Sequence, residues 1–247
     1  MTLRLGDLDP DARYDTWTRV VERIYREQVN QAWSHYMFRL VRAVFTTNST
    51  LSEEGGFIFT WMVENYVDSA LMLIRRELDR QAGTENLRNL LFDMIEHPTV
   101  ANRTRYISKW GKDEAVYRGL ADRAFDRFRP LRIPGRSGED HIDPLVIRTD
   151  LDHVAGRAEQ LREFAERTRA HRTPDQRTDT AGMSFKALHD AIADVRDVVA
   201  KYYALLTLSS ISQWEPVPQY DTLQAFTRPW LVDRGAVQQA VKDPRER

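Results

Sequence analysis

One stretch of the sequence, from Leu161 to Arg172, carries residue types suited to phosphate chemistry. It contains the histidine His171 and several arginines. An imidazole titrates near neutral pH and can accept or donate a proton, and a guanidinium group can brace a phosphate with two hydrogen bonds. Together they suffice for metal-free RNA cleavage, in which a 2′-hydroxyl attacks the adjacent phosphate. Spacing alone favours a simpler interpretation, in which His171 caps a helix by binding its last carbonyl groups.

Other polar combinations favour structural roles. His189, Asp190, Asp194 and Asp197 fall on nearly one face of a predicted helix. A hard metal ion could bind there, but a solvated face opposite an apolar stripe is the favoured interpretation. His35 has no partner pattern in its local sequence. The chain lacks a glycine-rich phosphate loop, a zinc-protease histidine pair, a nucleophile elbow and any cysteine, so we expect no metal and no cofactor.

The elements that must position these residues are helices, because apolar residues recur at intervals of three and four. We predict helices over about 10–45, 85–96, 113–128, 143–169 and 184–212, and a further helix that carries an apolar face over 57–78 and ends at Gly83. A break near Asn30 is expected to divide the first helix. Residues 46–52 are expected to form a turn, and Ser52-Glu53-Glu54 to open the second helix. Alternating strand patterns are absent, so the predicted fold class is all-α, an antiparallel helical bundle.

The predicted domain organisation is one bundle with a tail. Residues 1–212 form the bundle, 97–142 are a basic and mostly helical insertion between its central and penultimate long helices, and 213–247 are a tail rich in proline and aromatics. The helix over 57–78 is the most hydrophobic, so we expect it to be central. Core packing is favoured over base stacking for the aromatic residues at helical spacing, namely Trp17, Trp33, Phe57, Trp61 and Tyr66.

Composition limits the protein class and its surroundings. A chain of 247 residues with 42% hydrophobic and 30% charged residues is long and apolar enough to bury a core. The net charge of −1 provides no overall field for nucleic acid. The local excess of basic residues over 103–136 favours a solvated face over phosphate contact. No apolar signal core or membrane-spanning run is expected, which predicts a cytoplasmic protein without a membrane partner.

Three parts of the sequence resemble one family. Residues 68–79, Asp-Ser-Ala-Leu-Met-Leu-Ile-Arg-Arg-Glu-Leu-Asp, and residues 85–91, Glu-Asn-Leu-Arg-Asn-Leu-Leu, resemble the core segment of the abortive-infection AbiU-type HEPN family. The segment from Leu161, ending Ala170-His171-Arg172, resembles its terminal motif. The predicted helix that follows stands where the family has its final bundle helix. The resemblance covers roughly residues 11–212.

The resemblance implies a fold and two possible functions. It implies a HEPN bundle of four to five helices, commonly a homodimer whose two motifs face each other across the interface. Many HEPN proteins are metal-independent endoribonucleases in toxin–antitoxin or phage-defence systems. Others are catalytically silent modules that bind a protein or a nucleotide. The implied partners are RNA, a second copy of the chain, and a cognate antitoxin or regulatory protein.

The family motif is an arginine, a spacer of four to six residues, and a histidine, which His171 matches. The arginine is expected at Ala165 or, with the shortest spacing, at Glu166, and neither can brace a phosphate. Arg167 has a spacer one residue too short, and Arg162 has one that is too long. Because Arg167 and His171 share a helix face, Arg167 is the better substitute. The resemblance thus implies His171, Arg167 and Arg162 as catalytic residues.

Further arginines are expected to contact RNA. Arg169 and Arg172 flank His171, and Arg75 and Arg76 on the most hydrophobic helix could supply charge in place of the missing motif arginine. Three interpretations stay open: a HEPN ribonuclease, a silent HEPN binding module, and an unrelated helical scaffold.

Overall fold

The computed structural model describes residues 8–110, 115–129, 140–165 and 185–227. Within these ranges the chain is helical and has no strand apart from one isolated bridge between Asn102 and His141. The all-α prediction is therefore confirmed. The α-helices are α1 Pro10–Thr47, α2 Ser49–Glu54, α3 Gly56–Glu77, α4 Leu87–Glu96, α5 Arg103–Lys109, α6 Ala115–Phe125, α7 Pro144–Ala165 and α8 Phe185–Thr207. Short 3-10 helices cover Pro98–Val100, Asp126–Phe128 and Thr222–Thr227.

Helix α1 is one continuous helix of 38 residues. It begins as expected, with Asp9 accepting hydrogen bonds from the amides of Asp11 and Ala12 and with Pro10 in the first turn. The predicted break near Asn30 is wrong. No glycine or second proline interrupts the segment, and the low helix propensity of one exposed asparagine is too small to end a packed helix.

The connection from α1 to α3 is helical where a turn was predicted. The side chain of Asn48 caps α2 by accepting a hydrogen bond from the Leu51 amide. Glu53 therefore lies at the end of α2 and does not open α3, which begins at Gly56. Gly55 permits this tight joint, because a Cβ there would lie 2.6 Å from the Leu51 carbonyl oxygen and 2.7 Å from the Phe45 ring.

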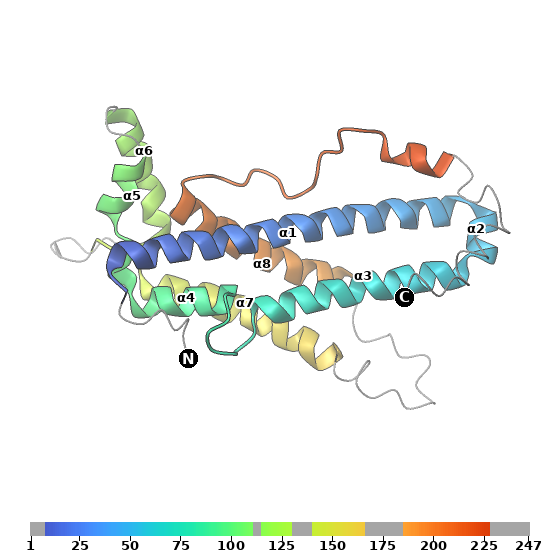
Figure 1. The fold of residues 1–247 in the computed structure, drawn as a ribbon, viewed down its shortest axis with the longest axis horizontal. Helices are drawn as coiled ribbons and strands as arrows, with labels where there is room; N and C mark the ends of the chain where they lie inside the picture. Colours follow the sequence, from blue (N-terminus) through green and yellow to red (C-terminus); the bar gives the residue numbers. More distant parts are fainter. Residues whose placement is uncertain (1–7, 111–114, 130–139, 166–184, 228–247) are drawn as a thin grey trace, which may run out of the picture.

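The arrangement is an elongated bundle around α1 (Figure 1). Helix α3 returns along α1 as the second arm of a hairpin whose tip is α2, and α8 packs against both α1 and α3. Helix α4 packs against α7, and α5 and α6 project at the end of the molecule opposite to α2. The segment after α8 runs back along α1 toward the hairpin tip, so that the 3-10 helix Thr222–Thr227 lies beside the half of α1 that is nearer to α2 (Figure 1).

Two helix ends differ from the prediction, and one helix was not predicted. Helix α3 ends at Glu77, and Gly83, at φ +80°, lies in the following connection. Helix α8 ends at Thr207 and not at residue 212, because Leu208 has a φ of +62° and leaves the helical region. Helix α5 was not predicted at all, since seven residues offer too little periodicity to be recognised.

The buried side chains form two clusters. The Trp17 cluster is the larger and joins α1, α4, α6, α7 and α8; its members include Trp17, Leu90, Phe125, Leu151, Val199 and Tyr202. The Phe38 cluster lies farther along α1 and consists of Phe38, Tyr66, Ala70, Ile74, Leu161, Leu188, Ala191 and Ile192. Helix α3 contributes Tyr66, Ala70 and Ile74 to the Phe38 cluster, from the middle of the helix onward.

The expectation that 57–78 is central is therefore wrong for the first half of α3. Phe57 is 85% exposed and Trp61 is 56% exposed, and Trp33 on α1 is also exposed. Trp17 and Tyr66 are buried, as predicted. Contrary to our prediction of no such run, α3 has the length and apolar composition of a membrane-spanning helix. The core helix of a soluble protein can share these two properties but is mostly buried, whereas only 22% of the apolar window of α3 is buried.

Buried charges at the α5 end of the molecule are paired. Arg13 donates to both carboxylate oxygens of Asp93, at 2.7 and 2.8 Å, and the Trp17 indole donates to the same carboxylate. Arg103, the first residue of the basic stretch, is buried and donates to three aspartates, namely Asp122, Asp126 and Asp140. These arginines hold helices together, so their charge is neutralised within the fold.

Candidate functional site, a histidine and arginine pocket between α1 and α8

Most of the predicted catalytic segment lies outside the described residues. His171, Arg167, Arg169 and Arg172 fall within 166–184, together with Glu166, and Arg162 lies near the end of α7. The motif that the family resemblance implies therefore stays a prediction.

The structure places Arg75 and Arg76 in the last turn of α3, beside a groove between α1 and α3. Arg76 pairs with Glu27 of α1 and lies 3.7 Å from the Glu77 carboxylate, whereas Arg75 is exposed. Because both line the α3 side of α1, neither contributes to the pocket on the α8 side.

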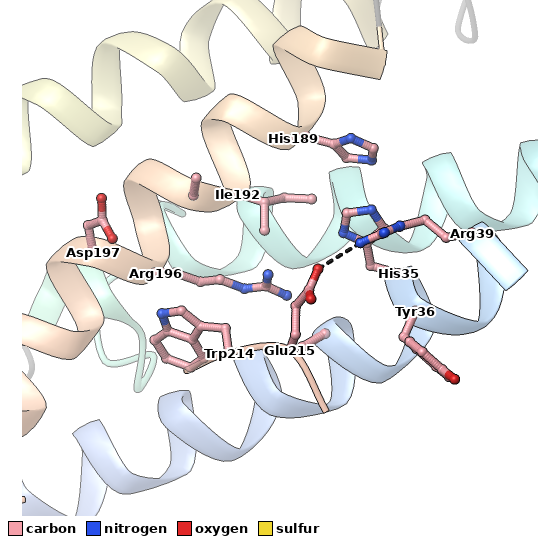
Figure 2. Close-up of a pocket in the computed structure, with 11 residues that line it drawn as sticks. His35, Tyr36, Arg39, His189, Ile192, Arg196, Asp197, Trp214 and Glu215 are labelled. Carbon is pink, nitrogen blue, oxygen red and sulfur yellow. Dashed lines mark hydrogen bonds and ion pairs between the residues drawn. The ribbon is translucent and has the colours of Figure 1, made fainter. Parts of the chain in front are cut away.

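That pocket has a volume of about 210 Å³ and combines three segments of the chain. Helix α1 forms one wall, α8 forms the other, and the segment after α8 crosses its mouth (Figure 2). Its polar lining consists of His35, Tyr36, Arg39, His189, Arg196, Asp197, Trp214 and Glu215.

Two imidazole rings meet in the pocket. The rings of His35 and His189 are stacked, with centroids 4.3 Å apart and planes 25° apart. The hydroxyl oxygen of Tyr66 lies 3.0 Å from Nε2 of His189. Burial raises the pKa of Tyr66 to about 12, so its hydroxyl keeps its proton and can donate to that nitrogen. Phe38 stacks on Tyr66 with centroids 4.3 Å apart, which fixes the hydroxyl toward the histidine pair.

Two guanidinium groups flank the imidazoles (Figure 2). Arg196 is only 9% exposed; one terminal nitrogen lies 3.4 Å from the Gln28 carbonyl, and its Nε has no hydrogen-bond partner among the described residues. Arg39 lies on the opposite wall and pairs with Glu215 at 2.6 Å. A buried cation with incomplete pairing is costly for a fold, so the pocket carries a positive charge that an anion would stabilise.

The same surroundings keep both histidines neutral. Burial, aided by the neighbouring His189, Arg196 and Arg39, lowers the pKa of His35 to about 4. Burial and the positive charge of Arg196 also lower the pKa of His189. At neutral pH the pocket therefore holds two uncharged imidazoles beside two cations, one of which, Arg39, is paired with the Glu215 carboxylate. An anion bound in the pocket beside the imidazoles would favour their protonated forms and raise the pKa values of His35 and His189.

Helix periodicity explains why these groups converge. His35 and Arg39 are four residues apart on α1, and His189 and Arg196 are seven apart on α8, so each pair lies on one helix face. The packing of α1 on α8 then brings the two faces together. The predicted solvated face is correct for Asp197, which is exposed, whereas His189, Asp190 and Asp194 are half-buried. Asp190 forms an ion pair with Lys186.

The pocket was missed because its halves are far apart in the sequence. His35 has no local partner, and its partner comes from the last helix. Each of the two helices carries a histidine and an arginine at helical spacing. This pattern is too common in amphipathic helices to identify α1 and α8 as the walls of a pocket.

A polar layer lies near the pocket in the interior. Gln28 and Gln31 of α1 are buried, and the Gln28 amide group and the Gln31 Nε2 have no partner among the described residues. Glu77 is fully buried, and its carboxylate accepts a hydrogen bond from the Leu87 amide. Burial and the adjacent Glu27 raise the pKa of Glu77 to about 7.

One further group has the composition of a metal site. Potential ligand atoms of Asp93, Glu96 and His97 lie within 4.8 Å of one another. Both Asp93 oxygens already accept hydrogen bonds from Arg13, and one also accepts from Trp17. The buried cation and indole leave this carboxylate poorly placed to bind a metal, so we assign it a structural role.

Comparisons with protein-family models, with curated proteins and with solved structures find no match to the chain. The pocket is therefore the feature from which a function can be inferred. Its two imidazoles can exchange protons and its two guanidinium groups can hold a phosphate, which are the groups needed for phosphodiester chemistry without a metal.

Proposed function

We propose that this protein acts on RNA, binding a phosphate of its substrate in the pocket between α1 and α8 and cleaving the adjacent bond without a metal ion. One observation carries the proposal: His35 and His189 lie face to face beside Arg39 and Arg196. This assigns proton transfer to described residues and leaves His171 as a separate, alternative histidine.

The chemistry follows from the pocket's charges. A neutral imidazole accepts the proton of the 2′-hydroxyl, whose oxygen attacks the phosphorus. The bond to the 5′-oxygen breaks, and that oxygen takes a proton from the second imidazole, protonated when the phosphate binds. The products are a 2′,3′-cyclic phosphate end and a 5′-hydroxyl end. Arg196 and Arg39 stabilise the charge that builds up on the phosphate oxygens.

The resemblance to AbiU-type HEPN proteins supports RNA as the substrate. It also supports a role in phage defence or a toxin–antitoxin system, assembly as a homodimer, and an antitoxin or regulatory protein as partner. These parts of the proposal depend on the short segments around Arg75 and His171.

The lowered histidine pKa values favour a second candidate, a catalytically silent module that binds a nucleotide. Burial holds the pKa of His35 near 4 and also lowers the pKa of His189, so neither ring is a proton donor at neutral pH before an anion binds. If the bound phosphate does not raise these pKa values, the pocket retains binding but lacks the acid needed for cleavage.

RNA incubation in the presence of EDTA tests the proposal. We expect cleavage that leaves 2′,3′-cyclic phosphate ends, and a loss of roughly 100-fold or more in His35→Ala and His189→Ala. His153→Ala is the matched control, because that imidazole is exposed on α7 and does not line the pocket. His171→Ala is measured in parallel.

The outcomes separate the candidates. Activity that survives both pocket substitutions but disappears in His171→Ala would move the catalytic site to the predicted motif. Nucleotide binding that requires Arg196, without cleavage, would support the silent module. A protein that neither binds nor cleaves RNA would contradict both.

A further inference from the structure

The segment that follows α8 places its own anion in the pocket. Residues 208–222, which we name the strap, leave α8 and run back along α1 (Figure 1). The Tyr36 hydroxyl oxygen lies 2.9 Å from the Thr222 hydroxyl oxygen. Between these ends, Trp214 and Glu215 line the mouth of the pocket. The strap therefore forms one side of the pocket.

The Glu215 carboxylate lies where a phosphate would bind. It pairs with Arg39 at 2.6 Å, and Figure 2 shows it between the guanidinium groups of Arg39 and Arg196. Carboxylate and phosphate use the same hydrogen-bond donors of an arginine. A phosphate that engages both arginines must therefore replace the Glu215 carboxylate.

We propose that Glu215 is an internal competitor that holds the strap over the pocket until the phosphate of the substrate displaces it. This inference rests on the proposed function, because it assumes that the pocket receives a phosphate. It assigns to the strap a regulatory role: the strap lowers the affinity for weak anions and opens for a ligand that can engage both arginines.

The Glu215 carboxylate is held weakly enough to be displaced. The side chains of Arg39 and Glu215 are 61% and 70% exposed, and exposed ion pairs contribute little to stability. Between α8 and the 3-10 helix the strap has no helix, and Val217 and Tyr220 are mostly exposed.

Trp214 packs the strap against the Trp17 cluster: its ring contacts the Tyr25 ring and lies 5.7 Å from the Arg196 guanidinium. The strap is therefore held at Trp214, at the exposed Arg39–Glu215 ion pair and at the Tyr36–Thr222 contact.

The start of the strap is strained. Leu208 has a φ of +62°, a left-handed conformation that side chains other than glycine, asparagine and aspartate rarely adopt. Backbone strain at a single junction marks a point where the chain can change direction. The Leu208 amide donates to the Ala204 carbonyl and so caps α8. Opening of the chain beyond this cap would move Trp214 and Glu215 away from the pocket together.

The test compares binding of a 2′-O-methyl RNA hexamer, which cannot be cleaved at the 2′-oxygen, to wild type and to Glu215→Gln. We expect affinity to rise about twofold to fivefold in Glu215→Gln, the range that loss of an exposed ion pair allows. Glu22→Gln makes the same charge change on an exposed part of α1 away from the pocket and should alter affinity far less. Hydrogen exchange of the strap amides should accelerate in Glu215→Gln, and also in wild type on binding the hexamer.

Each outcome decides the inference. Unchanged or weaker binding by Glu215→Gln would overturn the internal competitor, and the proposed function would stand if wild-type binding still required Arg196. Glu215→Gln could bind more tightly while the hexamer fails to accelerate hydrogen exchange of the strap amides in wild type. Glu215 would then act by electrostatic repulsion alone, and the proposed displacement of the strap would be wrong. A hexamer that binds neither protein would overturn the proposed function itself, and the inference with it.

Discussion

The two ends of the bundle use their charged and aromatic side chains in opposite ways. Around the Trp17 cluster, large side chains are buried and the charges of Arg13 and Arg103 meet carboxylates. At the hairpin tip, Phe57 and Trp61 face solvent. The pocket lies between these ends, beside the Phe38 cluster. Packing of large side chains thus stabilises the end around Trp17, whereas the hairpin tip leaves the aromatic rings of Phe57 and Trp61 exposed.

The arginines show the same contrast at the level of single residues. Arg13 and Arg196 are both buried, at 5% and 9% exposure. The first donates to both oxygens of Asp93, whereas the second has one long hydrogen bond and an unpartnered Nε among the described residues. The two arginines are similarly buried but differ in their pairing. Arg13 therefore has a structural role, whereas Arg196 is suited to binding an anionic ligand. The following substitutions test this contrast.

The largest effect is expected for Asp93→Ala in the Trp17 cluster. The substitution leaves the buried guanidinium of Arg13 without its counter-charge and removes the acceptor of the Trp17 indole. We expect the free energy of unfolding to fall by about 3–5 kcal/mol, measured by urea denaturation. Asp15→Ala removes an exposed carboxylate from the same helix and should change it by less than about 0.5 kcal/mol. Similar small losses in both variants would remove the contrast.

Glu77, near the boundary between the two clusters, is expected to make stability depend on pH. Burial raises the pKa of Glu77 to about 7 in the folded protein, against an ordinary 4.5. Between these values the folded state binds more protons than the unfolded state, so stability falls as pH rises from 4.5 to 7 and is then constant. Between pH 5.5 and pH 8, wild type should lose about 2 kcal/mol relative to Glu77→Gln. Parallel stability profiles for the two proteins would contradict the burial of an ionisable Glu77.

Arg196→Met should affect ligand binding more than stability. Removing the incompletely paired cation relieves its desolvation, so the free energy of unfolding should change by no more than about 1 kcal/mol. The affinity for the 2′-O-methyl RNA hexamer should fall about tenfold or more, because one of two phosphate ligands is lost. Arg26→Met, which removes an exposed charge from α1, serves as the control for net charge. A severe loss of stability with unchanged affinity would make Arg196 a structural residue like Arg13.

The smallest effect is expected for Phe57→Ser at the hairpin tip. The ring is 85% exposed, so its loss removes few contacts within the chain. The thermal or urea transition should shift by the equivalent of less than about 0.5 kcal/mol. A loss above about 1 kcal/mol would show that the tip is packed in solution and would weaken the comparison between the two ends.

Local periodicity predicted most of the helices but not their burial. The stripe on α8 predicted that helix and its inward face, because Leu188, Ile192 and Val195 repeat at helical spacing and are buried. Hydrophobicity did not predict the position of α3. Its first residues are as apolar as its last, but the buried residues of α3 begin only at Tyr66. Which part of an apolar face is covered depends on the lengths and positions of its neighbours.

The sequence by itself determined the all-α class, the long helices and the faces on which His35, Arg39, His189 and Arg196 lie, because these follow from the 3.6-residue period. Only the tertiary structure decided that these faces meet, that burial keeps both imidazoles neutral, and that Glu215 enters the same pocket. The physical reason is that a pocket consists of contacts between segments distant in the chain. Such contacts depend on how whole helices pack, and the spacing of residues within one helix does not predict that packing.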